Sequence, residues 1–206
     1  SVNLSSLAVS DNLILLSGEY VEISESGSYI CKSDHSGNIL AKTKISNITG
    51  KDNVSLRKIF SDKNGEIWAL MNDGYSNKSI VVNLDQNMNS KKIIDFDIGA
   101  EDFIVDSYGR IALSDYVNEE IILYDSEGNY LYSEKITKES HCFEAGGKYY
   151  TAVPNIQKSE TVIYLLDFDK KNISPGIWNI MPTITADHLG VVGGLTKKFD
   201  TMSLYV

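Results

Sequence analysis

Apolar residues form four short runs between residues 103 and 136, and polar turn residues separate these runs. The runs cover residues 103–105, 111–113, 121–124 and 130–136. Short apolar runs bounded by Asp, Ser, Asn and Gly are typical of antiparallel strands, whereas no helical spacing persists here over the roughly ten residues that a helix needs. The pattern therefore predicts a four-stranded antiparallel meander, and it predicts no helix in the chain.

The turns between these runs recur elsewhere at a regular spacing. The turn at 34–40 returns at 125–131, and a third copy with Asn at the turn in place of Gly lies between them at 83–89. A second turn type, Asp62-x-x-Gly65, returns as Asp106-x-x-Gly109, and weaker copies occur at 10–13 and 145–148. Four-stranded repeats with a period of about 45 residues are typical of propeller blades, which must stack on neighbours to bury both faces.

We therefore expect an all-β chain, a β-propeller of four-stranded blades with about five blades visible, in which residues 1–206 form a single domain. The last 25 residues, 182–206, have room for about three strands, so the fifth blade lacks its outer strand. Either residues 2–4 supply a short closing strand, or the chain is a piece of a larger ring, such as one of six blades. The expected units are 7–45, 56–98, 103–136, 142–180 and 183–206.

The pattern hydrophobic-Asp-x-x-Gly-x-Ile-x-hydrophobic-Ser-Asp-Tyr, followed by Ile-x-hydrophobic-Tyr-Asp-x-x-Gly, spans residues 105–131. It resembles the NHL-type repeat of β-propellers, clearly in units two and three and more loosely elsewhere. This resemblance implies the propeller fold. Members of that class are mostly ligand-binding or partner-binding modules, and a minority are enzymes, including lyases and metal-dependent lactonases, so the resemblance leaves the chemistry open.

Composition excludes some classes of partner. The formal net charge is −9 and the pI is about 4.8, so the electrostatic field repels nucleic acid and anionic membrane surfaces. No apolar run approaches the 18 or so residues of a membrane span, and we expect no membrane insertion. We expect Cys31 and Cys142 not to pair, because they fall at different places in the repeat. The compartment stays open, with an extracellular or cell-envelope location slightly favoured.

Three tyrosines end the second strand of three units, and each has a neighbouring acidic residue. Strand alternation places Tyr20, Tyr75 and Tyr116 at the end opposite the Asp-x-x-Gly turns, together with Asp73 and Asp115. Such rings are suited to stacking on a sugar or a peptide side chain. We predict these five residues as a ligand-binding site around the mouth of the central channel. The alternative, slightly favoured for any single ring, is a tyrosine wedged between blades with its hydroxyl bonded to backbone.

No residues indicate a metal, a cofactor or a catalytic group. The Asp62-x-Asn64-Gly65 turn lacks the further carboxylates of a calcium loop, and turn chemistry explains it better. No histidine pair has the spacing of a zinc site, and no nucleophile motif is present. A glycine pair, Gly193-Gly194, is best interpreted as a flexible turn because no helix follows it. The three histidines are His35, His141 and His188.

The sequence therefore favours a non-enzymatic module that binds a protein, peptide or glycan on one axial face. One alternative is a propeller enzyme, a lyase or hydrolase, that acts on a small or saccharide substrate in the central channel with Asp73 and Asp115. Another is a scaffold domain of a larger protein. Enzymes of this fold usually gather His, Arg or several carboxylates, and this chain is poor in such clusters, so we expect no enzyme.

Overall fold

A computed structural model describes residues 2–10, 13–21, 26–62, 64–76, 78–136, 140–155, 160–175, 194–198 and 201–205. Side chains are described for 14–16, 18, 28–62, 64–76, 78–136, 140–154 and 161–175. The chain divides into two compact units, Ser1–Glu101 (unit one) and Asp102–Val206 (unit two), which differ from the five repeat units that the sequence predicts.

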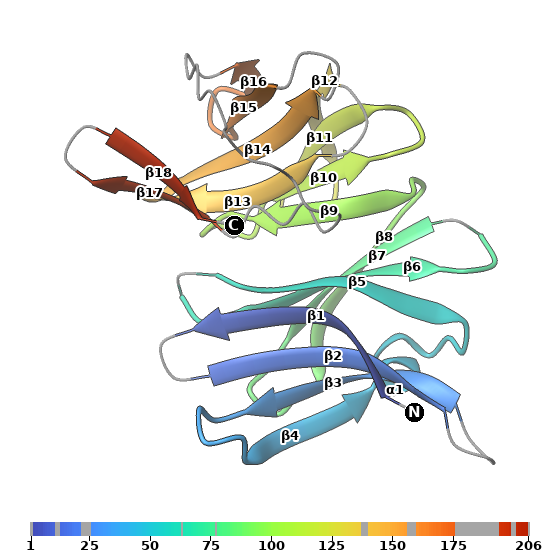
Figure 1. The fold of residues 1–206 in the computed structure, drawn as a ribbon. Coiled ribbons are helices and arrows are strands. Elements are labelled where there is room, and N and C mark those ends of the chain that lie inside the picture. Colours follow the sequence, from blue (N-terminus) through green and yellow to red (C-terminus); the bar gives the residue numbers. More distant parts are fainter. Residues whose placement is uncertain are drawn as a thin grey trace. The chain divides into compact units, whose positions relative to one another are not determined.

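Four four-stranded antiparallel sheets follow one another along the chain, each with its strands in chain order (Figure 1). Unit one holds β1 (Val2–Ser10), β2 (Leu13–Val21), β3 (Ser26–Ser33) and β4 (Ile39–Lys44), then β5 (Val54–Ser61), β6 (Ile67–Asp73), β7 (Lys78–Leu84) and β8 (Ser90–Phe96). Unit two holds β9 (Ala100–Val105, which begins at the end of unit one), β10 (Ile111–Asp115), β11 (Glu120–Tyr124) and β12 (Tyr130–Lys135), then β13 (His141–Ala145), β14 (Lys148–Asn155), β15 (Glu160–Asp167) and β16 (Asn172–Pro175). The predicted all-β meander at 103–136 is confirmed as β9 to β12.

The fifth predicted unit differs from expectation. The described residues after 175 form one two-stranded sheet of β17 (Gly194–Lys198) and β18 (Thr201–Tyr205), and the expected strand at 189–192 lies outside them. The described residues thus form about four blades and a hairpin, not about five blades. Gly194 begins β17 and is not part of a turn, because its backbone pairs with Tyr205; Gly193 lies outside the described residues.

The Asp-x-x-Gly turns have the predicted geometry. Gly65, Gly109 and Gly128 have φ of 77°, 78° and 86°, the left-handed region that favours glycine. In the last of these turns Asp125 Oδ1 accepts hydrogen bonds from the backbone N–H groups of Glu127 and Asn129, both at 2.8 Å. The carboxylate therefore satisfies turn donors, which is the chemistry expected from the sequence.

The middle copy of this turn was assigned incorrectly. The residue in the glycine position is Met88, with φ of 67°, and not an asparagine. The turn is otherwise the same, since the N–H of Met88 donates to the carbonyl of Asp85 at 3.0 Å. The Met88 side chain is fully buried, so its packing offsets the backbone strain.

Near the start of the chain, one prediction was wrong and one of two open alternatives is not observed. The segment Ile45–Thr49 is a short helix, α1, where we expected no helix; it ends at Gly50, which has φ of 68°. Its five residues are too few for helical periodicity to show. Residues 2–4 are not a separate closing strand but the first part of β1, where Val2 pairs with Tyr20. A register shift between Leu4 and Ser6 interrupts the alternation of the side chains, so residues 2–10 do not show in the sequence as one continuous strand.

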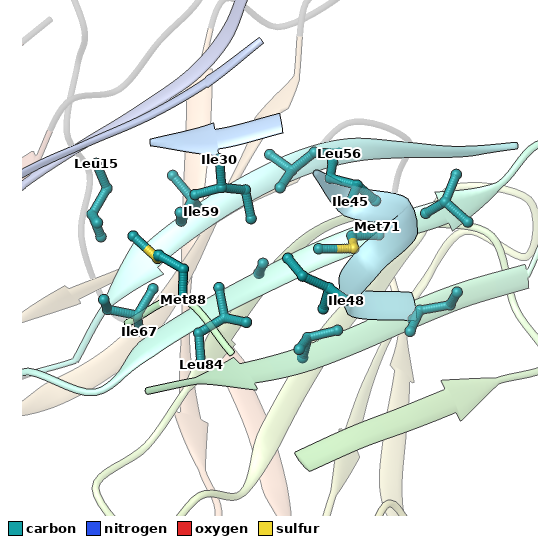
Figure 2. Packing of buried hydrophobic residues seen from close by; sticks show 14 residues of the cluster. Leu15, Ile30, Ile45, Ile48, Leu56, Ile59, Ile67, Met71, Leu84 and Met88 are labelled. Carbon is teal, nitrogen blue, oxygen red and sulfur yellow. The ribbon is translucent and has the colours of Figure 1, made fainter. Parts of the chain in front are cut away.

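The core of unit one lies between its two sheets, and α1 contributes to it (Figure 2). Ile45 and Ile48 extend from α1 toward Leu56 of β5 and Met71 of β6. Ile30 of the first sheet belongs to the same cluster. The middle strands β6 and β7 are buried almost throughout, whereas β4 and β8 are largely exposed, as expected for sheets covered on both faces.

Unit two is built in the same way. Strands β10 and β11 are buried along nearly their whole length, and β12 is the exposed edge. At the end with the Asp-x-x-Gly turns, Arg110 binds Asp106 through Nε at 2.7 Å and Asp169 through Nη1 at 2.7 Å. Its guanidinium also lies 5.2 Å from the ring centre of Phe168. Arg110 thus joins the β9–β10 turn to the β15–β16 turn.

Candidate functional site

The predicted tyrosine loops connect the second and third strands of their sheets, at the end opposite the Asp-x-x-Gly turns. Tyr20 lies in β2, opposite Gly27 of β3, and its side chain lies outside the described residues. Tyr75 lies in the β6–β7 turn and Tyr116 in the β10–β11 turn. The structure therefore has Tyr75 and Tyr116 at the ends of the sheets where the sequence placed them.

The Tyr75 loop belongs to unit one and is highly exposed. The Tyr75 ring is 88% accessible, and its backbone N–H donates to Asp73 Oδ1 at 2.9 Å. That hydrogen bond lowers the pKa of Asp73 from its usual value. The adjacent Gly74 lies so close to Asn53 that an added Cβ would be 2.5 Å from its Nδ2. Asp73 thus shapes the loop, and the exposure of Tyr75 rules out a wedge role for this ring.

The Tyr116 loop belongs to unit two and presents two adjacent apolar side chains. Tyr116 is 43% exposed and Val117 is 61% exposed. Beneath them, Asp115 is only 1% exposed, and its carboxylate accepts bonds from the Val117 N–H at 2.9 Å and from the Asn118 N–H and Nδ2 at 3.1 and 2.6 Å. Asp115 therefore holds the loop and does not face a ligand.

Bonds from the neighbouring strand fix the other side of the Tyr116 loop. The Ile136 N–H donates to the Glu119 carbonyl at 2.9 Å, and Lys135 Nζ donates to the Asn118 carbonyl at 2.9 Å. Glu119 adopts φ of 55°, which a non-glycine residue takes only when its surroundings require it. The loop is therefore pre-organised, and its exposed surface is the pair Tyr116 and Val117.

A histidine and a buried aspartate lie at the same end of unit two, and sequence reasoning missed them. Asp102 Oδ1 accepts a bond from the Phe103 N–H at 2.6 Å, and its Oδ2 accepts one from the Cys142 N–H at 3.1 Å. His141 Nδ1 lies 3.6 Å from Asp102 Oδ2, and 47% of the His141 side chain is exposed. A buried carboxylate thus faces one ring nitrogen of a half-exposed imidazole, which is a common arrangement in binding and catalytic sites.

A serine pair links the two features. Ser114 Oγ lies 2.5 Å from Ser140 Oγ, and both side chains are buried. Ser114 is two residues from Tyr116, and Ser140 immediately precedes His141. Even with a fully extended backbone between Tyr116 and Ser114 and between Ser140 and His141, the Cα atoms of Tyr116 and His141 lie within about 18 Å of each other. The candidate site is therefore this end of unit two, consisting of Tyr116, Val117 and the His141–Asp102 pair.

Tyr124 of unit two and the two cysteines of the chain offer little chemistry. Burial, followed by the charges of Asp115 and Glu120, raises the pKa of Tyr124 to about 12. Its phenol is therefore neutral at ordinary pH. Cys31 and Cys142 form no disulfide and both are buried, and burial raises the pKa of the Cys31 thiol, so it is a poor nucleophile.

The described residues contain no group of three or more His, Cys, Asp or Glu side chains arranged to hold a metal ion. His35 is exposed in the β3–β4 turn, and His188 lies outside the described residues. No described helix is long and apolar enough to cross a membrane.

No protein-family model matches the chain, and no curated protein matches it. Solved structures are similar. A protein of unknown function from Bacteroides caccae matches at a TM-score of 0.60 and 12% identity, over 84% of this chain and 60% of its own. A catalytically inactive virginiamycin B lyase from Staphylococcus aureus, with quinupristin, matches at 0.56 and 12%, over 98% of this chain and 63% of its own. The propeller domain of the trilobed protease from Pyrococcus furiosus, described as having an open velcro topology, matches at 0.55 and 12%, over 86% and 57%.

These similarities establish the fold. The chain is an all-β protein of four-stranded antiparallel blades and has the β-propeller fold, as the sequence predicted. It spans about three fifths of the length of the structures that it matches. At such low identity the neighbours carry no information about activity or ligand.

Proposed function

We propose that this chain is a non-enzymatic binding module, and that it recognises a peptide segment of a partner protein through the Tyr116–Val117 loop. The observation that supports this proposal is an exposed apolar pair on a loop whose backbone is already held by internal hydrogen bonds. Pre-organisation lowers the entropy cost of binding, and exposed tyrosines are frequent energetic centres of interfaces.

Among protein, peptide and glycan, the loop favours a peptide or protein. A sugar is recognised through several hydrogen bonds to its hydroxyls, whereas the Asp115 carboxylate is used within the loop. Val117 beside Tyr116 offers apolar surface that suits a peptide side chain. The net charge of −9 favours a neutral or basic ligand over an acidic one, and it disfavours nucleic acid.

A random-peptide phage library and a glycan array supply the probes for a test. The double variant Tyr116→Ala, Val117→Ser removes the apolar pair, and Tyr108→Ala is the matched control because Tyr108 is 75% exposed at the other end of β10. We expect peptides selected on the wild type to lose at least about tenfold in affinity for the double variant and to bind the control normally.

The proposal would be contradicted if the selected peptides bound the double variant as tightly as the wild type. It would also be contradicted if the wild type selected no peptide from the library. If a glycan on the array bound and its binding required Tyr116, while no peptide bound, the ligand would be a glycan and not a peptide. Both variants should keep the melting temperature of the wild type, since exposed substitutions change stability by only about 0.5 kcal/mol.

A second candidate function is a lyase or hydrolase acting on a small or saccharide substrate, and the His141–Asp102 pair favours it. An imidazole oriented by a carboxylate is a suitable proton acceptor. Incubation with panels of oligosaccharides and cyclic esters, followed by mass spectrometry, would test it. Products that form with the wild type but not with the His141→Ala variant would support an enzymatic function. If no compound of either panel is converted, the enzymatic function is contradicted.

We also propose that the repeats are of the NHL type. The support is that Asp106 and Gly109, like Asp125 and Gly128, occupy equivalent turn positions within residues 105–131. Homologous sequences provide the test, because these four positions should then be kept together in them. Free variation at the two glycines would contradict an NHL repeat.

A further inference from the structure

The His141 imidazole lies at the same end of unit two as the Tyr116–Val117 loop, and the proposed peptide contact leaves it unused. We infer that His141, oriented by Asp102, is the polar contact of the same site and accepts a hydrogen bond from an N–H or O–H donor of the bound peptide. This inference rests on the proposed function and adds to it a specific residue and a specific ligand chemistry.

Asp102 is held so that it can orient the ring. Its Oδ1 accepts the N–H of Phe103 on β9 and its Oδ2 accepts the N–H of Cys142 on β13, at 2.6 and 3.1 Å. These bonds to two strands fix the carboxylate, which is almost fully buried. The oxygen that faces His141 is therefore in a constant position, 3.6 Å from Nδ1.

The position of the carboxylate determines which nitrogen carries the proton. A neutral imidazole has one N–H, and a nearby carboxylate favours that proton on the nitrogen that faces it. In the neutral form of His141 the nitrogen that faces Asp102 is Nδ1, and Nε2 is then the acceptor. Within the described part of the chain, Asp102 is the one polar partner of the imidazole, and about half of the ring is exposed. Nε2 can therefore accept a hydrogen bond from a ligand.

The separation of the two contacts suits a short peptide. The Ser114–Ser140 hydrogen bond ties the base of the Tyr116 loop to the residue before His141. The upper limit of about 18 Å between the two Cα atoms corresponds to roughly five extended residues. A peptide can thus place an apolar side chain against Tyr116 and Val117 and, within a few residues, a donor at His141.

The test combines a ligand-free measurement with a binding measurement. Nitrogen-15 NMR of the imidazoles reports the tautomer of His141 directly, and we expect the Nδ1–H form in the wild type. For binding, isothermal titration uses the peptides selected from the phage library. We expect His141→Ala to weaken binding about tenfold, the value of one lost hydrogen bond, and His35→Ala, an exposed histidine in unit one, to leave it unchanged.

The outcomes separate this inference from the proposed function. If the Tyr116→Ala, Val117→Ser variant loses binding while His141→Ala binds normally, the inference fails and the proposed function stands. A dominant Nε2–H tautomer in the wild type would also overturn the inference. If no peptide is selected, both fail together. Asp102→Asn can disturb folding, because Asp102 joins two strands, so the NMR measurement on intact wild type and the His141→Ala variant decide the result.

Discussion

Met88 adopts a backbone conformation that side chains rarely take, and the cause lies in the core of unit one. Its φ of 67° matches that of the glycines in the equivalent turns, so the turn geometry is kept without a glycine. The left-handed conformation costs a side-chain-bearing residue about 1–2 kcal/mol. The fully buried Met88 side chain packs among Ile67 and Leu84, which offsets that cost.

Replacing Met88 by glycine tests this balance. The change removes the strain but also a buried side chain, and large-to-small core substitutions cost about 2–5 kcal/mol. We expect Met88→Gly to lower the free energy of unfolding by about 2 kcal/mol, measured by urea denaturation, because the packing loss exceeds the strain relief. A more stable variant would show that strain dominates.

Gly128 provides the opposite case. Its φ of 86° suits glycine and strains a β-branched side chain. We expect Gly128→Val to lower the free energy of unfolding by about 1 kcal/mol or more, measured in the same way. Unchanged stability would mean that the turn can move to a negative φ at little cost.

The turn aspartates predict the behaviour in acid. Hydrogen bonds from the side chain and backbone of Asn38, Asn89 and Asn129 lower the pKa of Asp34, Asp85 and Asp125 respectively. A lowered folded-state pKa means that the stabilisation is complete above the unfolded pKa, near 4, and is lost as pH falls through the folded value. We expect the melting temperature to fall below about pH 4, and to fall less in the variant with all three changed to Asn. Parallel curves for the two proteins would contradict this.

At the scale of elements, the sequence predicted strands well wherever a turn motif bounded them. The strands β9 to β12 could be predicted because the turns Asp106–Gly109 and Asp125–Gly128 separate their apolar runs in the sequence. The helix α1 was missed because five residues give only the pair Ile45 and Ile48. A strand boundary near a bulge, as in β1, was also missed, since the bulge shifts the alternation.

The candidate site was only half predictable, for a physical reason. Tyr116 was found because its loop repeats along the chain. Asp102 and His141 are 39 positions apart and lie in no motif, and they approach each other only because β9 and β13 are brought together in the fold. Likewise Asp115 was predicted to face a ligand, but its environment makes it a buried acceptor for turn donors.

A single arginine connects two elements of unit two, and its removal should be costly. Arg110 Nη2 lies 2.6 Å from Asp106 Oδ2, and Asp106 is nearly fully buried. We expect Arg110→Ala to lower the free energy of unfolding by about 3 kcal/mol, because a buried carboxylate loses its counter-charge.

Lys91→Ala supplies the control for this change. Lys91 pairs with Glu66 at 2.5 Å, but both side chains are exposed, so the expected loss is below about 1 kcal/mol. Equal losses for the two variants, measured by urea denaturation, would show that burial of Asp106 does not make its ion pair stronger than an exposed one.

At the scale of the whole molecule, each sheet depends on being covered from both sides. Strands β6, β7, β10 and β11 bury both of their faces, which a lone four-stranded sheet cannot do. In unit one this cover comes from the stacking of its two sheets, whose apolar side chains form one shared cluster. The Asp-x-x-Gly carboxylates cap turns by hydrogen bonds to backbone, and that role needs no metal.

This role leads to a prediction about metal removal. In the turn most like a calcium loop, Asp62 Oδ1 accepts the N–H groups of Asn64 at 2.8 Å and Glu66 at 2.9 Å. A metal that binds only the folded state raises its stability by mass action, so removing such a metal would lower the melting temperature. We expect dialysis against EDTA to leave the melting temperature unchanged, and later addition of Ca²⁺, Mg²⁺ or Zn²⁺ not to raise it. A fall with EDTA that one of these ions reverses would mean that the carboxylates hold a cation in addition to capping their turns, and Asp62→Asn should then remove the response.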